Sequence, residues 1–231
     1  MSAPSPPLRR LAEAARALGE GLAGLAYPSL CLGCEARISP ADALCPSCLR
    51  GLPRPVEAPA VPERAPIDRI VALWTYDPGG TVRRVHHALK YGARPSLGVG
   101  LGRMVGAAVA ETGAVPEVVT PVPLSKPRFL ERGYNQAERL AEGVGQALGV
   151  PNETLLRRTR ATRAQASLSK AERRQNVDGA FELVEDAEVG GRRVLLVDDV
   201  LTTGATLAAA ARPLAEAGAR VTVGVLGLAG W

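Results

Sequence analysis

Two adjacent aspartates follow a run of aliphatic residues near the carboxyl end of the chain. The stretch from Val194 to Thr206 reads VLLVDDVLTTGAT, and Asp198 and Asp199 stand at its centre. The aliphatic residues before them are typical of a buried parallel strand, so we expect the two acids where that strand leaves the sheet. Carboxylates in this position can accept hydrogen bonds from hydroxyl groups or lie beside a bound cation.

The loop after the two acids consists of small residues and opens a helix. It contains Thr202, Thr203, Gly204, Ala205 and Thr206. Backbone N–H groups of a glycine-containing loop at a helix start form a concave anion site, and threonine hydroxyls add donors. We therefore predict a phosphate cradle beside acids that take hydroxyls, which together fit a phosphorylated sugar. The alternative is an acidic strand end followed by an ordinary threonine N-cap. The loop lacks the GxxxxGK[ST] pattern of ATP-binding P-loops.

The four cysteines of the chain form two CxxC pairs. Cys31 and Cys34 are separated by ten residues from Cys45 and Cys48. Two such pairs fit a tetrahedral zinc site, whereas two disulfides or free thiols are disfavoured in the cytoplasm. Because protein would fill all four positions, we expect the zinc to be structural and to fold a segment too small to fold alone.

The composition restricts the location and the partners. The 231 residues include 46% hydrophobic and 3% aromatic residues and carry a net charge of +5. This charge indicates either a mild attraction to phosphates or nucleic acid, or a solvated basic surface. We find no Lys/Arg block interleaved with aromatic residues, as a platform for single strands requires. No uncharged apolar run reaches about 18 residues and no secretory signal is evident, so we predict a cytoplasmic protein without a membrane span.

The order of the patterns predicts four regions. Residues 1–26 contain an amphipathic helix, expected to dock on the protein rather than on a membrane. Residues 27–52 form the four-cysteine zinc module, and residues 53–66, with five prolines, a stiff linker. Residues 67–231 alternate strand and helix signals. We therefore expect an α/β fold with a parallel sheet flanked by helices, and a ligand site at the carboxyl ends of its strands.

Further polar residues are candidates for the same site. Residues 121–128, PVPLSKPR, follow a short buried strand and offer Ser125, Lys126 and Arg128 as donors to an anion. The sequence RGYNQ, residues 132–136, comes next and also fits a polar helix cap. The basic stretch 157–176 is longer than usual α/β connections and also fits a solvated loop or short helix.

Two histidines and a lysine lie in one predicted helix, residues 81–92. His86 and His87 are adjacent, and adjacent helical residues point in different directions, so they do not form a joint ligand pair. We interpret both histidines as helix-surface residues. Lys90 is either a donor to a phosphate or a surface lysine, and we favour the surface lysine.

Together these motifs resemble the competence protein F (ComF) family, which joins a double zinc ribbon to a type I phosphoribosyltransferase-like domain. VLLVDDVLTTGAT is similar to the phosphoribosyl pyrophosphate (PRPP) signature of type I phosphoribosyltransferases. The cysteine pairs, PVPLSKPRFLERGYNQA and RRTRATRAQASLSKAERRQNVDGAF extend the resemblance over nearly the whole chain. The part after the linker also resembles the transferase domain of amidophosphoribosyltransferase, without its glutamine-hydrolysing domain.

The resemblance implies a role for each motif. Asp198 and Asp199 would be the catalytic pair and contact the ribose hydroxyls, directly or through Mg²⁺, while residues 202–206 would hold the 5′-phosphate. Residues 121–128 would hold pyrophosphate, and residues 157–176 would be a mobile hood over PRPP. The residues assigned to the pyrophosphate loop and hood are Pro123, Leu124, Ser125, Lys126, Arg128, Arg132, Arg163, Gln165, Lys170, Arg173 and Arg174.

These roles imply a pentosyltransferase that binds Mg–PRPP, or a related 5′-phosphoribosyl ligand, and transfers phosphoribose to an unidentified acceptor with release of pyrophosphate. Mg²⁺ would arrive with PRPP, since the chain shows no dedicated cluster for it. No general base for an acceptor is evident. The alternative is a non-catalytic factor for DNA uptake that binds phosphate or single-stranded DNA, because the family name refers to competence. The resemblance is also compatible with a homodimer.

Overall fold

The computed structural model describes residues 29–39, 42–55, 65–77, 79–92, 95–159 and 179–229. The helix predicted within residues 1–26 and most of the linker lie outside these residues. The same holds for the predicted hood residues Arg163, Gln165, Lys170, Arg173 and Arg174.

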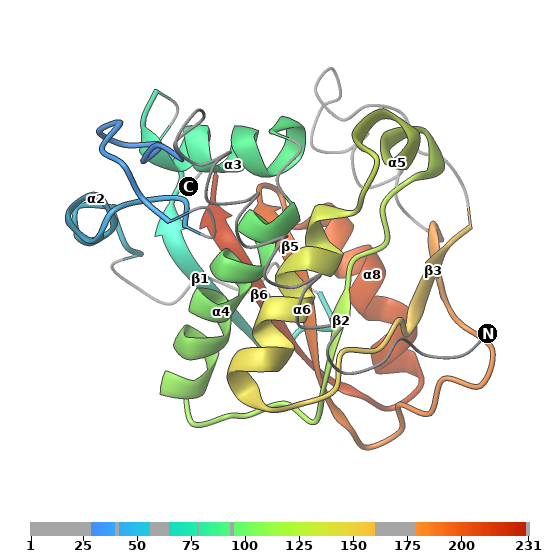
Figure 1. Ribbon diagram of the computed structural model, residues 1–231. Coiled ribbons are helices and arrows are strands. Elements are labelled where there is room, and N and C mark those ends of the chain that lie inside the picture. Colours follow the sequence, from blue (N-terminus) through green and yellow to red (C-terminus); the bar gives the residue numbers. More distant parts are fainter. Residues whose placement is uncertain are drawn as a thin grey trace, which may run out of the picture.

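A four-stranded parallel sheet forms the centre of the molecule (Figure 1). Its strands, in spatial order, are β1 (Arg69–Thr75), β6 (Arg220–Leu228), β5 (Arg193–Leu201) and β2 (Val118–Pro121). Every neighbouring pair is parallel. The chain passes from the β1 edge to the β2 edge and then fills the middle, so β5 and β6 are the central strands. The predicted parallel sheet with flanking helices is confirmed.

Helices cover both faces of the sheet (Figure 1). One face carries α3 (Thr81–Tyr91), α4 (Pro95–Glu111) and α6 (Gln136–Leu148), and the other carries α8 (Ala205–Glu216). Successive residues of β5 serve the two faces in turn: Leu195 packs with the α3 side and Leu196 with the α8 side. The aliphatic run of β5 thus contributes to two separate cores, as a central strand requires.

Glycines bring α4 and α6 close together. A Cβ at Gly102 would lie 2.1 Å from the Leu140 carbonyl oxygen, and one at Gly143 would lie 2.0 Å from that of Val99. Only residues without a side chain allow this approach. The close packing fixes the position of α6, whose first residue reaches the carboxyl end of the sheet.

Shorter elements complete the described residues. Strand β3 (Leu156–Arg158) pairs with β4 (Phe181–Leu183) in an antiparallel ladder outside the main sheet. The predicted loop at residues 121–128 ends at Ser125, the N-cap of α5 (Lys126–Arg132), because Pro127 suits the first helical turn. Helix α2 (Pro46–Arg50) follows Cys45. Among the helices that the structure describes, none is both long and apolar enough to cross a membrane.

Candidate functional site

The two acids lie where β5 extends beyond its neighbour β2. Strand β5 pairs with β2 through Val197 and with β6 through Leu201. The Val122 N–H donates to the Val197 carbonyl at 2.9 Å, after which the chain turns away toward α5. The backbone of Asp198 and Asp199 therefore has a strand on one side only, at the carboxyl edge of the sheet where ligands of parallel sheets bind.

The alternation of the strand turns the two side chains to opposite faces. Leu195 and Val197 belong to the core on the α3 side, so Asp199, two residues on, points to that side as well. Asp198 follows Leu196 and points to the α8 side. Their repulsion is thereby reduced, although they remain adjacent in sequence.

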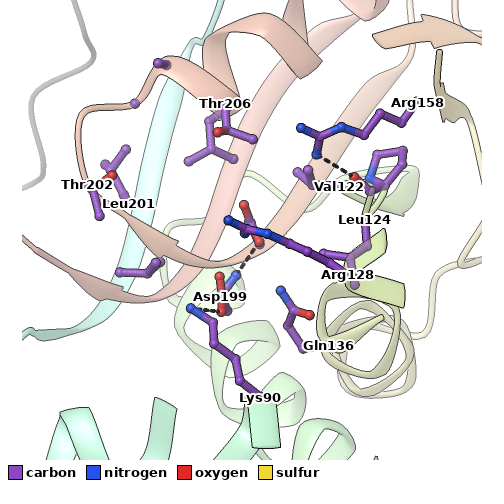
Figure 2. Close-up of a pocket in the computed structure, with 16 residues that line it drawn as sticks. Lys90, Val122, Leu124, Arg128, Gln136, Arg158, Asp199, Leu201, Thr202 and Thr206 are labelled. Atoms are coloured by element: carbon purple, nitrogen blue, oxygen red, sulfur yellow. Dashed lines mark hydrogen bonds and ion pairs between the residues drawn. The ribbon is translucent and has the colours of Figure 1, made fainter. Parts of the chain in front are cut away.

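Asp199 is held by two side chains of α3, His86 and Lys90, of which Figure 2 shows Lys90. Its Oδ2 atom lies 3.1 Å from His86 Nε2 and 3.0 Å from Lys90 Nζ. Burial alone would raise the pKa of Asp199, but His86 and Lys90 outweigh it and hold that pKa well below its ordinary value. The prediction that His86 is a surface residue is wrong, because His86 is only 7% exposed. Lys90 is half-buried, with 21% of its side chain exposed, and it pairs with Asp199. His87 is exposed, as predicted, and its ring lies 4.9 Å from that of Tyr91.

Asp198 has the opposite electrostatic environment. Burial and the negative charge of Asp199 raise the pKa of Asp198 well above its ordinary value. Its Oδ1 accepts a hydrogen bond from the Asp199 N–H at 2.8 Å. The carboxyl group is half-buried and lines a cavity, where a donor or cation from a ligand would stabilise its ionised form.

That cavity has a volume of about 380 Å³ and joins several elements (Figure 2). It is lined by Lys90, Val122, Pro123, Leu124, Arg128, Gln136, Arg158, Asp198, Asp199, Val200, Leu201, Thr202, Gly204, Ala205, Thr206 and Leu207. The N-cap of α8, Gly204, has φ 73°, a left-handed conformation that favours glycine. The first turn of α8 thus borders the cavity, with its backbone N–H groups and the hydroxyls of Thr202 and Thr206 as donors.

Cations from three elements surround the same cavity. Lys90 comes from α3, Arg128 from α5 and Arg158 from β3. Arg128 extends across the cavity in Figure 2, and Arg158 donates to the Pro123 carbonyl at 3.5 Å. Burial, with a smaller effect of Arg128, lowers the pKa of Arg158. The guanidinium also lies over the Phe181 ring, 5.1 Å from its centre. A polyanion would therefore meet several fixed positive charges here.

The structure brings most of the predicted site residues together. Pro123, Leu124, Arg128, Asp198, Asp199, Thr202, Gly204, Ala205 and Thr206 all line the cavity. Thr203 is half-buried beside it, Ser125 is buried at the start of α5, and Lys126 is exposed. Arg132 instead donates to Gln136 Oε1 at 2.8 Å and lies over the Tyr91 ring.

His86 was not predicted for the site, and Lys90 was interpreted as a surface lysine. Gln136 and Arg158 entered only as parts of the candidate stretches 132–136 and 157–176. The spacing of His86 and Lys90 by four residues is the one signal in the sequence, because it places both on one side of a helix. It does not show what that side contacts.

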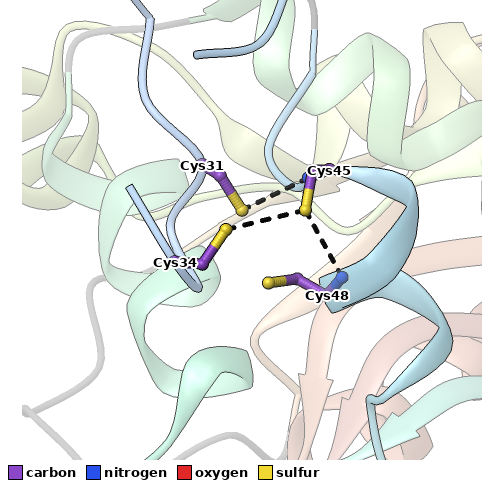
Figure 3. A group of neighbouring side chains, drawn as sticks. All are labelled: Cys31, Cys34, Cys45 and Cys48. Carbon is purple, nitrogen blue, oxygen red and sulfur yellow. Dashed lines mark hydrogen bonds between the residues drawn. The ribbon is translucent and has the colours of Figure 1, made fainter. Parts of the chain in front are cut away.

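The four cysteines lie together in a separate cluster (Figure 3). All four Sγ atoms are within 4.8 Å of one another, and those of Cys34 and Cys45 are 3.7 Å apart. Sulfur atoms around a tetrahedral zinc ion are about 3.8 Å apart, given Zn–S bonds of about 2.3 Å. A Cβ at Gly33 would lie 2.6 Å from Cys48 Sγ, so glycine is needed in the first knuckle. The cluster can hold zinc.

The protonation of the cysteines also fits a metal site. Backbone N–H donors, chiefly that of Cys45, outweigh burial and lower the pKa of Cys31 to about 6. The neighbouring sulfurs, first of all Cys34, raise the pKa of Cys48 to about 12. Four neighbouring thiolates repel one another, and a divalent cation would remove this repulsion by stabilising all four at once.

Comparison with known proteins places the site in context. A family model described as a phosphoribosyl transferase domain matches residues 132–229. DNA utilization protein YhgH of Salmonella typhimurium is 32% identical over 207 residues, which cover 84% of this chain and 88% of that protein. Competence protein F of Haemophilus influenzae is 46% identical over 95 residues, 40% of this chain and 42% of that protein.

Solved structures are similar over part of the chain. Glutamine PRPP amidotransferase from B. subtilis, complexed with ADP and GMP, is 28% identical with a TM-score of 0.41. The similarity covers 60% of this chain and 30% of the amidotransferase chain.

Proposed function

The chain belongs to the competence protein F family, and from this premise we propose that it binds Mg–PRPP, or a related 5′-phosphoribosyl ligand, and transfers phosphoribose to an acceptor with release of pyrophosphate. One observation carries the proposal. The two acids of β5, the first turn of α8 and three cations line a single cavity. A phosphorylated sugar with a second phosphate group matches each of these surfaces.

The sugar phosphate would lie along β5 and α8. Backbone N–H groups of residues 202–206 and the threonine hydroxyls would bind the 5′-phosphate, because the start of α8 favours negative charge. Asp198, and the edge of Asp199 that reaches the cavity, would accept hydrogen bonds from the ribose hydroxyls. The ribose would then be held both at its 5′-phosphate and at its hydroxyl groups.

The pyrophosphate group would face Lys90, Arg128 and Arg158. These cations would bind it in the ground state and stabilise its growing charge as the bond to the anomeric carbon breaks. The cavity also fits Mg²⁺, since Asp198 offers carboxylate oxygen, the ligand type this ion prefers. When bound with PRPP, Mg²⁺ would neutralise phosphate charge.

The residues of the chain would act chiefly by positioning the ribose and the pyrophosphate. The anomeric carbon becomes positively charged as pyrophosphate leaves, so the reaction needs a fixed ribose, a held leaving group and little water. Asp198 and Asp199 would orient the ring, while Leu201, Leu207 and Val122 supply apolar walls to the cavity. The acceptor would complete the reaction by attacking this carbon.

One surface favours the alternative, binding of single-stranded DNA without catalysis. No residue of α5 is buried, and Phe129 and Leu130 are 45% and 78% exposed beside Lys126 and Arg128. Helix α5 therefore exposes one aromatic ring beside cations, and an aromatic ring with neighbouring cations suits a stacked base and its phosphates. The relatives named for DNA utilization and competence agree with this second function.

Titration calorimetry with Mg–PRPP tests the proposed ligand. We expect wild-type protein to bind and Asp198→Asn to bind about ten- to hundredfold more weakly, a change of about 1.4–2.8 kcal/mol. Asp186→Asn, at an exposed turn with φ 65°, is the matched control and should bind like wild type. Equal affinities for wild type and Asp198→Asn would contradict the proposal.

Two further assays separate transfer from accessory binding. A screen of nucleobases, amines and ammonia with Mg–PRPP should release pyrophosphate with one acceptor class if the protein is a transferase. Labelled single-stranded DNA titrated at several salt concentrations should instead show steep loss of affinity with salt if the second function is correct.

A further inference from the structure

The four-cysteine module is anchored to helix α3 by one arginine. Arg84 Nε donates to the Leu32 carbonyl at 2.6 Å, and Nη2 lies 3.5 Å from the Gly33 carbonyl. Leu32 and Gly33 are the two residues between Cys31 and Cys34. Arg84 therefore holds the knuckle that two of the predicted zinc ligands share.

The module and α3 also share a buried core. Cys31, Leu44 and Leu52 are buried in the same hydrophobic cluster as Val82 and Val85 of α3. At the end of the module, the N–H of Thr75 in β1 donates to the Pro53 carbonyl at 2.8 Å. A displacement of the knuckle would thus disturb the packing of α3, because close-packed cores transmit such shifts.

The same helix carries the two side chains that hold Asp199. His86 and Lys90 lie within two turns of Arg84, and both reach Asp199 Oδ2 at ion-pair distance. The His86 ring also packs edge-on against Tyr76, with centres 5.9 Å apart. Figure 1 shows the module beside α3, with the carboxyl end of β5 beyond the helix.

We propose that the four-cysteine module is a metal site thermodynamically coupled to the cavity, with Arg84 as the positioning residue. Metal held by the cysteines fixes the knuckle, the knuckle fixes α3, and α3 holds His86 and Lys90 against Asp199. Because coupling is reciprocal, a change at Asp199 must alter metal affinity as much as metal alters the state of Asp199. The consequence for PRPP rests on the proposed function, whereas the link between cysteines and Asp199 does not.

Zinc affinity provides the test without any phosphoribosyl ligand. Full-length zinc-loaded protein is equilibrated with a chromogenic chelator, and the zinc affinities of Asp199→Asn and Asp186→Asn are compared. We expect Asp199→Asn to bind zinc about fivefold or more weakly, within the usual range of coupling between sites. Asp186→Asn, at an exposed turn, should match wild type. Lys90→Met tests the same contact from the α3 side and should also lower zinc affinity.

Histidine NMR tests whether a change at the four-cysteine module alters the contact between His86 and Asp199. The chain has two histidines, so the imidazole signals of His86 and His87 can be assigned with His87→Asn. In zinc-loaded Arg84→Met we expect the His86 signal to shift toward its position in Asp199→Asn, and the His87 signal to remain. Arg83→Met, the neighbouring arginine on α3, should leave both signals in place.

The outcomes distinguish the two proposals. Equal zinc affinity of Asp199→Asn, Lys90→Met and wild type, or an unmoved His86 signal in Arg84→Met, would overturn the coupling. If the coupling is observed but wild-type protein does not bind Mg–PRPP, the coupling stands and the proposed ligand is wrong.

Discussion

The two faces of the sheet give the adjacent acids of β5 opposite electrostatic environments. On the α3 face, Asp199 is buried against His86 and Lys90, and its charge is compensated inside the protein. On the α8 face, Asp198 borders a cavity next to the start of a helix, and its pKa is raised. Asp199 is therefore held chiefly by the protein and reaches the cavity only at its edge, whereas Asp198 is more available to a ligand.

This difference explains how a chain tolerates two like charges side by side. A buried carboxylate is stable when cations surround it, and a carboxyl without such partners shifts its pKa or awaits a bound group. A ligand that brings hydroxyl donors or a cation to Asp198 would bind partly because it relieves this unfavourable environment. The same carboxyl would contribute little to the stability of the free protein.

Replacement of each acid by asparagine should have unequal effects on stability. Asp199→Asn leaves Lys90 without its counter-ion and His86 without its carboxylate partner, and breaking a buried pair destabilises proteins by about 3–5 kcal/mol. Asp198→Asn removes an unfavourable charge and should leave the free energy of unfolding unchanged or raised. Urea denaturation at pH 7 measures both. The contrast between the faces would be lost if the two variants were destabilised equally.

The pH dependence should sharpen the same contrast. The folded pKa of Asp199 is lowered, so its contribution to stability is present above the unfolded value of about 3.9 and is lost as pH falls through the folded pKa. The folded pKa of Asp198 is raised, so its contribution is present below about 3.9 and is lost as pH rises through the folded pKa.

Denaturation between pH 3 and pH 8 checks these signs. The stability of wild type relative to Asp199→Asn should decrease toward acid, and its stability relative to Asp198→Asn should decrease toward neutral pH. Parallel curves for the two differences would mean that the acids share one environment.

A smaller effect is expected at the glycine that begins α8. Gly204→Ala places a side chain at φ 73° and should destabilise the protein by about 1–2 kcal/mol. Gly113→Ala, at φ 72° with open space around its Cβ position, is a control with the same backbone strain. Only Gly204→Ala should also weaken Mg–PRPP binding, because only Gly204 lines the cavity. Thermal denaturation and calorimetry separate the two effects, and equal loss of affinity in both variants would argue against a phosphate cradle.

Local motifs could be predicted from the sequence, and long-range contacts could not. The run from Val194 to Thr206 predicts its own backbone structure, because an aliphatic strand, two acids and a glycine-containing turn follow one another without interruption. The CxxC spacing similarly brings the sulfurs together within one short segment. In each case the residues that cooperate are close in sequence.

His86 and Lys90 show the limit of such prediction. Their partner Asp199 is more than a hundred residues away, and they meet it only because α3 packs across the end of the central strand. The pairing of β3 with β4 outside the main sheet could not be predicted for a related reason, since the two strands are separated by more than twenty residues. Both outcomes depend on tertiary packing rather than on local pattern.

A crystal structure of the zinc-loaded protein with Mg–PRPP would show whether the cavity at β5 and α8 binds this ligand. We expect the 5′-phosphate within about 3 Å of backbone N–H groups between Thr202 and Thr206, and a ribose hydroxyl at hydrogen-bond distance from Asp198. We also expect Asp199 to keep its contacts with His86 and Lys90. A ligand bound away from β5 and α8, or crystals that take up no PRPP at saturating concentration, would contradict the proposed site.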